Sequence, residues 1–168
     1  MIRTDTLFLD RDGVINIKLK DKYVQSFSEF QFIDKSLDAI RMLTNIFKRI
    51  IIVTNQQGIG KGIMSIEDLN QLHQNMITEI NLHGGKIDKI YYCPHLETDN
   101  CECRKPGIGM LSEAVRDFPN INIERSYLVG DSITDIQAGE IFGLRTVHVN
   151  NQFTLYSWAI EFLEKTKF

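Results

Sequence analysis

The chain has 168 residues, of which 43% are hydrophobic and 24% are charged, a composition typical of a folded globular protein rather than of a disordered one. The formal net charge of −3 argues against a protein whose main role is to bind long nucleic acid. No stretch approaches the roughly 20 apolar residues of a membrane span. We therefore predict a single domain over residues 1–168, with no membrane association and no nucleic-acid partner.

The N-terminus and the cysteines indicate a reducing compartment. The first ten residues, MIRTDTLFLD, have only a short apolar run before an acid, so they predict no signal peptide. The chain has three cysteines, and an odd number without an export signal does not suit a framework of disulfides. We expect a cytoplasmic protein, and we expect it to be a monomer.

The first half of the chain alternates apolar runs with helical patterns. TLFLD (6–10) is predicted to be a buried strand that ends on an acid. Residues 36–49 have apolar side chains at helical spacing, and the β-branched run IIIVTN (50–55) is predicted to be a strand. From Ser65 onward, a capping-box pattern and an apolar stripe predict a long helix that stops at a Gly-Gly pair.

The second half of the chain continues the same alternation. Continuous apolar strands between helices predict an α/β fold, with a mainly parallel sheet covered by helices on both faces. The expected elements are, in chain order, a strand at 87–92, a helix near 107–118, a strand at 126–130, a helix at 135–143, a strand at 145–150 and an amphipathic helix at 154–166.

Acids follow two of the predicted strands. LDRDGV places Asp10 and Asp12 at the end of the first strand, and Asp131 follows the fourth. Ligands of such sheets bind outside the carboxyl ends of the strands, and buried carboxylates are costly unless a cation or hydrogen bonds compensate them. One such acid would more often only cap a turn or helix, but three that converge predict an oxygen-lined Mg²⁺ site.

A phosphate substrate at this edge of the sheet would use the same residues. Mg²⁺ between Asp10 and a phosphate would remove their repulsion and align the carboxylate for in-line attack. Asp12 would protonate the leaving oxygen and later take a proton from water. Thr54 and Lys105 would hold the equatorial oxygens in the transition state.

All three cysteines lie in the segment CPHLETDNCECRKPG. Cys93, His95, Cys101 and Cys103 follow the order C-x-H-x5-C-x-C, a soft ligand set suited to tetrahedral Zn²⁺. Four protein ligands leave no open position for water or substrate, so the predicted zinc is structural and would fix a loop with little core of its own. The alternative is three free thiols in an exposed loop.

Four segments, in order, resemble the signatures of the haloacid dehalogenase superfamily of phosphatases: DRDGVIN, TNQQGIGKG, CPH…CEC-RKPG and GDSITD. The match runs from about residue 6 to residue 149, and it most resembles the D-glycero-D-manno-heptose 1,7-bisphosphate 7-phosphatases and the histidinol-phosphate phosphatases. The resemblance implies a Rossmann-like core without a large cap domain, a zinc loop at 93–103, and phosphomonoester hydrolysis through an aspartyl-phosphate.

Site residues follow from the resemblance position by position. It implies that Asp10 is the nucleophile, and that Asp12 is the acid/base whose backbone carbonyl also binds Mg²⁺. It makes Asp131 a further Mg²⁺ ligand, while Thr54 binds the phosphoryl group and Lys105 stabilises it. The other implied residues are Asn55, Gln56, Gln57 and Arg104 as substrate contacts, and Asp135 as a supporting acid.

Two features depart from the family pattern. The segment between DRDGVIN and YVQSF, which usually contributes substrate contacts, is longer here. After Asp131 many of the bisphosphatases have a lysine, whereas this chain has Ser132. Lys61 either replaces that cation or is a solvated loop charge.

Other patterns are assigned no chemistry. GIGKG superficially suggests a nucleotide P-loop, but no Ser or Thr follows the lysine. The remaining histidines, His73, His83 and His148, have no partner at ligand spacing and are predicted to be surface or core residues.

The predicted function is a Mg²⁺-dependent phosphatase that removes the 7-phosphate of D-glycero-D-manno-heptose 1,7-bisphosphate during precursor synthesis for lipopolysaccharide. Histidinol phosphate or another small sugar or metabolite phosphate is the alternative substrate, and a nucleic-acid 3′-phosphate fits the acidic balance less well. The alternatives that are not enzymes are a receiver domain and a catalytically silent zinc-binding scaffold. A receiver would carry its phosphoacceptor at the third strand end, where this chain has Tyr92-Cys93-Pro94-His95, and a scaffold leaves the acids unexplained.

Overall fold

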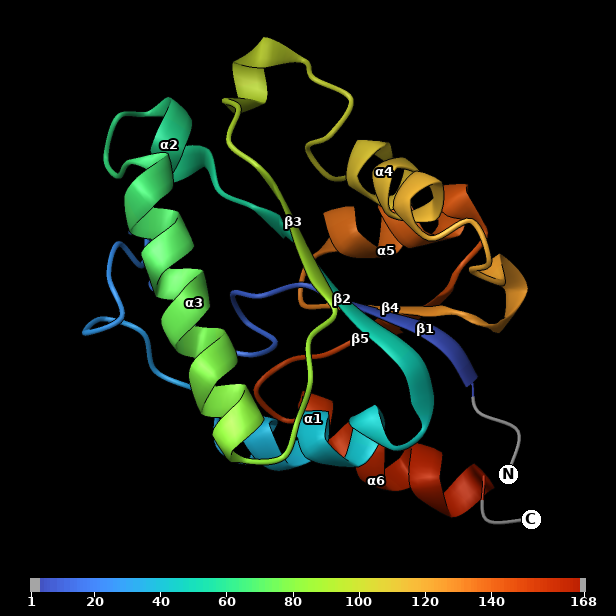
Figure 1. The fold of residues 1–168 in the computed structure, drawn as a ribbon. Coiled ribbons are helices and arrows are strands. Elements are labelled where there is room, and N and C mark those ends of the chain that lie inside the picture. Colours follow the sequence, from blue (N-terminus) through green and yellow to red (C-terminus); the bar gives the residue numbers. More distant parts are fainter. Residues whose placement is uncertain (1–3, 167–168) are drawn as a thin grey trace.

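The computed structural model describes residues 4–166, and the two ends of the predicted domain, residues 1–3 and 167–168, lie outside this range. A central sheet carries helices on both of its faces (Figure 1). Its five strands have the order β3-β2-β1-β4-β5, and each neighbouring pair is parallel. The predicted α/β fold is confirmed. No helix among the described residues has the length and apolar character needed to cross a membrane.

The elements alternate along the chain as the apolar pattern predicts. The strands are β1 (Thr4–Leu9), β2 (Phe47–Asn55), β3 (Lys89–Cys93), β4 (Tyr127–Gly130) and β5 (Arg145–His148). The α-helices are α1 (Ser36–Thr44), α2 (Gln57–Gly60), α3 (Ile66–Leu82), α4 (Gly109–Asp117), α5 (Ile133–Phe142) and α6 (Leu155–Thr166), and two short 3₁₀ helices are η1 (Glu97–Asp99) and η2 (Ile123–Arg125).

The sheet has an apolar core on each face. Leu7 and Leu9 of β1 pack with side chains of α1, α3 and α6, whereas Phe8 packs on the other face with side chains of α4 and α5 (Figure 1). Successive side chains of a strand point to opposite faces, so a strand covered on both sides has a continuous apolar sequence. This explains why TLFL and IIIV have no polar alternation.

The predicted helix over 36–49 is too long. Helix α1 ends at Thr44, and Phe47 already belongs to β2, where it is paired with Thr4 of β1. The ring of Phe47 packs 6.3 Å from that of Trp158. A short apolar run fits a helix end and a strand start equally well by periodicity, so only the pairing with β1 separates them.

The helix predicted from Ser65 is confirmed as α3. The backbone N–H of Asp68 donates to Ser65 Oγ at 3.0 Å and the Ser65 N–H donates to Asp68 Oδ2 at 2.9 Å, which is the predicted capping box. The buried face of α3 includes His73 together with its apolar side chains. This helix therefore places an imidazole inside the protein, beside the carboxyl end of β1.

Candidate active site

Three acids meet at the carboxyl ends of β1 and β4. Asp10 follows β1, Asp131 follows β4, and Asp135 lies in the first turn of α5. One carboxylate oxygen from each lies within 4.8 Å of the others. Because β1 and β4 are neighbouring parallel strands, the residues after them are adjacent. Of the three acids predicted to converge, the structure brings Asp10 and Asp131 together. The carboxylate that completes the cluster is that of Asp135 and not that of Asp12.

A glycine makes room for the carboxylate of Asp131. Gly13 has a φ of +88°, and a Cβ there would lie 2.2 Å from Asp131 Oδ2. Asp131 Oδ2 accepts a hydrogen bond from Lys18 Nζ at 3.2 Å, whereas its Oδ1 is buried without a partner among residues 4–166. An unpaired carboxylate oxygen between two further acids is a ligand that a hard divalent cation can use. The cluster therefore fits Mg²⁺.

Lys105 neutralises part of this acidic cluster. Its ammonium is buried and donates to Asp10 Oδ1 at 2.9 Å and to the Val53 carbonyl at 2.8 Å, and it lies 2.6 Å from Asp135 Oδ1. The side chain of Asn55 binds the backbone of Lys105 twice, at 3.0 Å to its N–H and at 3.2 Å to its carbonyl oxygen. Hydrogen bonds thus fix both the backbone and the ammonium group of Lys105.

The electrostatics of the cluster favour a cation. Burial raises the pKa of Asp10 to about 7, against the opposing charge of Lys105 and with the help of the neighbouring acids. Burial alone would lower the pKa of Lys105, but the carboxylates of Asp10 and Asp135 outweigh it and raise that pKa. A divalent cation beside Asp10 would favour its ionised form, which is the form that can act as a nucleophile.

The carboxylate of Asp12 is held separately from the acidic cluster. Arg11 Nη2 donates to both of its oxygens, at 2.9 and 3.1 Å, while Asn16 Nδ2 donates to Oδ1 at 2.9 Å and Gln56 Nε2 to Oδ2 at 3.0 Å. Burial opposes ionisation, but the Arg11 charge and these hydrogen bonds hold the pKa of Asp12 below its usual value. Gln56 Nε2 also donates to Oγ1 of the buried Thr54 at 2.9 Å.

A cavity of about 260 Å³ opens beside these residues. Basic side chains line it, with Lys18, Lys22 and Arg104 added to Lys105. The Nη1 of Arg104 is buried and has no hydrogen-bond partner in the described part of the chain. Arg104 therefore lines the cavity with a donor that the protein leaves unsatisfied.

The three predicted substrate contacts from Asn55 to Gln57 line the cavity, but their side chains already bind within the protein. Gln57 Nε2 donates to the hydroxyl of Tyr23 at 3.0 Å, and its Oε1 accepts from the Glu97 N–H at 2.7 Å. Gln57 thus connects the cavity wall at Tyr23 to η1. The structure gives these residues a role in shaping the cavity.

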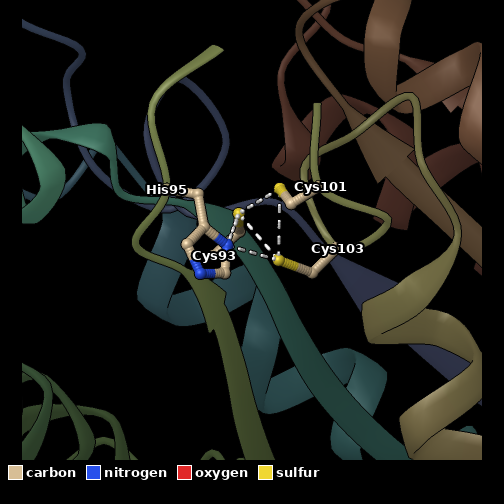
Figure 2. Close-up of side chains that lie close together, drawn as sticks. All are labelled: Cys93, His95, Cys101 and Cys103. Carbon is tan, nitrogen blue, oxygen red and sulfur yellow. Dashed lines mark hydrogen bonds between the residues drawn. The ribbon is translucent and has the colours of Figure 1, made fainter. Parts of the chain in front are cut away.

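The four predicted zinc ligands lie together at the end of β3 (Figure 2). The sulfur of Cys103 lies 2.9 Å from that of Cys93 and 3.1 Å from His95 Nδ1, and Cys101 Sγ lies 3.5 Å from both other sulfurs. Tetrahedral zinc with bonds of about 2.0–2.3 Å separates its ligands by roughly 3.3–3.8 Å. The separations of 3.5 Å lie in this range, and the two shorter ones are a few tenths of an ångström below it. The donor set, gathered this closely, fits zinc.

The sulfur cluster lies close in the chain to Lys105. Cys93 is the last residue of β3, and its carbonyl accepts a hydrogen bond from the Gln56 N–H at 2.8 Å. Cys103 stands two residues before Lys105. A metal at this position would join the sheet to the segment that carries Lys105 and Arg104.

The sequence of this chain matches that of a known protein family. The sequence model of the family described as polynucleotide kinase 3 phosphatase matches residues 7–154. The chain belongs to this phosphatase family. The match covers both acidic strand ends and the sulfur cluster.

Two curated proteins similar to this chain are named as phosphatases of a heptose bisphosphate. The D-glycero-beta-D-manno-heptose-1,7-bisphosphate 7-phosphatase of Neisseria meningitidis is 39% identical over 137 residues, which are 82% of this chain and 72% of the relative. The D-glycero-alpha-D-manno-heptose-1,7-bisphosphate 7-phosphatase of Campylobacter jejuni is 43% identical over 138 residues, which are 82% and 77% of the two chains. The predicted family resemblance is confirmed.

Solved structures of phosphatases share the fold. The D,D-heptose 1.7-bisphosphate phosphatase of B. bronchiseptica, whose crystal structure is complexed with magnesium and phosphate, has a TM-score of 0.82 and 28% identity, and the match covers 96% of this chain and 99% of that one. The corresponding enzyme of Burkholderia thailandensis has a TM-score of 0.68 and 27% identity over 95% and 98% of the chains. The Rossmann-like fold implied by the haloacid dehalogenase resemblance is therefore confirmed.

Sequence reasoning missed two residues of this phosphatase site. Arg11 was not singled out and His73 was assigned no chemistry, yet Arg11 Nη1 lies 3.0 Å from His73 Nε2 beside Asp12. A signal was present, because an arginine between two acids directly after a buried strand needs internal acceptors if it is buried too. His73 also falls on the buried stripe of α3, four residues after Leu69.

Proposed function

We propose that the protein is a Mg²⁺-dependent phosphatase that hydrolyses the 7-phosphate of D-glycero-D-manno-heptose 1,7-bisphosphate. One observation carries the proposal: Asp10 lies within reach of Asp131 and Lys105 at the rim of a basic cavity. Curated relatives at 39% and 43% identity are named for this reaction. Relatives named for the beta and for the alpha anomer both match, so the proposal includes both anomers.

The residues that would hold Mg²⁺ are Asp10 and Asp131, together with the backbone carbonyl of Asp12. When bound, the ion supplies charge neutralisation between the carboxylates and the phosphate. Asp135 acts in support, because its Oδ2 accepts from the Ser132 N–H at 3.1 Å and its Oδ1 lies against Lys105. Ser132 is therefore used in capping α5.

The chain's own residues perform two displacements at phosphorus. A carboxylate oxygen of Asp10 attacks the 7-phosphoryl group and the bond to the sugar oxygen breaks. Asp12, which enters this step in its protonated form, gives that oxygen the proton and becomes a carboxylate. Asp12 then takes a proton from water, which attacks the aspartyl-phosphate and releases inorganic phosphate and free Asp10. Lys105 stabilises the charge that develops on the phosphoryl oxygens, and Thr54 supports the same group.

The cavity suits a substrate with a second phosphate. Lys18 and Lys22 extend from the long segment before YVQSF, and Arg104 presents a buried unpaired donor on another side. Lys18 already pairs with Asp131, but a single phosphoryl group at Asp10 would not engage Lys22 and Arg104 as well. The second anionic group of a bisphosphate would satisfy them.

We also propose a structural zinc at Cys93, His95, Cys101 and Cys103, in a reducing cytoplasm. Its support is the soft donor set and the short distances between the donor atoms. The three cysteines carry no disulfide, which suits that compartment. The zinc would keep Arg104 and Lys105 in place beside the cavity.

Substrate comparison tests the proposed function. Phosphate release should be measured as kcat/KM for both heptose bisphosphate anomers, histidinol phosphate and a nucleic-acid 3′-phosphate, with Mg²⁺ and with chelator. We expect a Mg²⁺-dependent preference for a heptose bisphosphate. A preference for histidinol phosphate or for the nucleic acid would reject the substrate, and the absence of release from all four would reject the enzyme.

A further inference from the structure

The guanidinium of Arg11 is enclosed next to the acid/base residue. Arg11 is 0% exposed, and its only ion pair among the described residues is with Asp12. A single guanidinium nitrogen, Nη2, contacts both carboxylate oxygens of Asp12, and these charge-assisted contacts restrain the carboxylate. The orientation of the Asp12 carboxylate therefore depends on this guanidinium together with the hydrogen bonds from Asn16 and Gln56.

His73 holds the other end of the guanidinium. Its Nε2 lies 3.0 Å from Arg11 Nη1, although the two residues are 62 positions apart. Burial, with the charge of Arg11, lowers the pKa of His73 to about 3, so the ring is neutral and Nε2 accepts the hydrogen bond. The ring of Phe30 lies 6.0 Å from the guanidinium carbon, while Arg11 Nε has no partner in residues 4–166.

Few groups accept hydrogen bonds from the guanidinium of Arg11. Without the imidazole, Nη1 would lose its acceptor and Nε already has none, so Asp12 alone would hold the hydrogen-bonding groups of the guanidinium. A buried donor without an acceptor is costly, and the side chain would move to relieve it. Since Nη2 contacts both oxygens of Asp12, that movement would pull the carboxylate away from the position in which Asn16 and Gln56 also hold it.

We infer that His73 is a positioning residue for the acid/base Asp12 and that it acts through Arg11. The inference rests on the proposed phosphatase function. His73 touches neither the substrate nor the acidic cluster in this role, and it transfers no proton. It fixes the orientation from which Asp12 protonates the leaving oxygen.

The leaving group provides the readout. An alkyl oxygen leaves only with a proton from Asp12, whereas p-nitrophenolate is stable without one. The value of kcat/KM covers the steps up to formation of the aspartyl-phosphate, so it reports this proton transfer. For His73→Leu we expect about a tenfold loss with the alkyl phosphate that the wild type hydrolyses best, and less than about a twofold loss with p-nitrophenyl phosphate.

Three further variants separate positioning from stability. His73→Gln offers a carbonyl acceptor to Arg11 and should restore most of the alkyl phosphate activity. Ile80→Val removes one buried methylene from the same helix, away from Arg11, and should lower stability without changing the ratio of the two substrates. Arg11→Lys keeps the charge but has no second nitrogen to join Asp12 to His73, so it should reproduce the leaving-group effect if His73→Leu does not fold.

Each outcome decides the inference. Equal losses with both phosphates, or no rescue by His73→Gln, would make His73 a structural residue only and overturn the inference. Unchanged kcat/KM with both phosphates would overturn it as well, because Arg11 would then hold Asp12 unaided. A wild-type protein that hydrolyses neither phosphate would reject the proposed function instead.

Discussion

The ammonium nitrogen of Lys105 lies 2.9 Å from Asp10 Oδ1, although 95 positions of the chain separate the two residues. The contact is buried, and Asn55 holds the backbone of Lys105 from the end of β2. A fixed cation beside a buried carboxylate compensates part of the cost of its ionisation. The ion pair thus favours the ionised form of Asp10, the proposed nucleophile, against the burial that raises its pKa.

Asp10→Asn should lower kcat for phosphate release by about three orders of magnitude or more, since an amide oxygen is a poor nucleophile. The fold should remain, because Lys105 keeps Asp135 and the Val53 carbonyl as partners. Steady-state kinetics and the far-UV circular dichroism spectrum check both points. Substantial turnover by a folded variant would remove Asp10 as the nucleophile.

Gly13→Ala should raise the Mg²⁺ concentration needed for half-maximal activity by about tenfold or more, because the new Cβ would displace the carboxylate of Asp131. Gly62→Ala is the matched control, because Gly62 also has a positive φ, of +68°, but open space where its Cβ would lie. Left-handed backbone costs each alanine roughly 1–2 kcal/mol of stability. If the Mg²⁺ concentration for half-maximal activity rose equally in the two variants, backbone strain alone would explain the effect.

Zinc should be found in nearly stoichiometric amount in the purified protein, and His95→Gln should lose most of it because one of four ligands is gone. The exposed His83 makes His83→Gln a control that should keep its zinc. Elemental analysis measures the metal, and Tm with and without a chelator measures its contribution to stability. Native protein free of zinc would refute the site. Retention of zinc by the double variant Cys101→Ser, Cys103→Ser would refute it too.

Acid should destabilise the protein in part through His73. Its pKa falls from the usual value of about 6.5 to about 3, so between these two pH values the unfolded chain binds a proton that the folded chain does not. The free energy of unfolding should therefore fall as pH falls through this window, by at most about 1.4 kcal/mol per pH unit from this group.

His73→Leu should remove the contribution of His73 to the dependence of the unfolding free energy on pH. The variant should also be less stable than the wild type near pH 7, because Arg11 loses an acceptor. Urea denaturation at several pH values between 4 and 7 measures the difference. His83→Gln, at an exposed position, should keep the wild-type slope. A slope unchanged in His73→Leu would mean that His73 titrates normally in the folded protein.

Local sequence patterns determined much of this protein. Continuous apolar runs predicted the two-faced parallel sheet, since a strand buried on both sides has no polar alternation. Asp10 and Asp131 were placed at the sheet edge because both directly follow such runs. The spacing of Cys93 to Cys103 was sufficient to predict the sulfur cluster, since its ligands lie within one loop.

The tertiary structure alone decided which distant side chains meet. The end of α1 at Thr44 depended on the pairing of Phe47 with β1, and the contact of Arg11 with His73 depended on how α3 packs against the sheet. Such contacts join residues that no short window of sequence contains. Periodicity assigns a residue to a buried face, but the register of the strands and the packing of the helices choose its partner there.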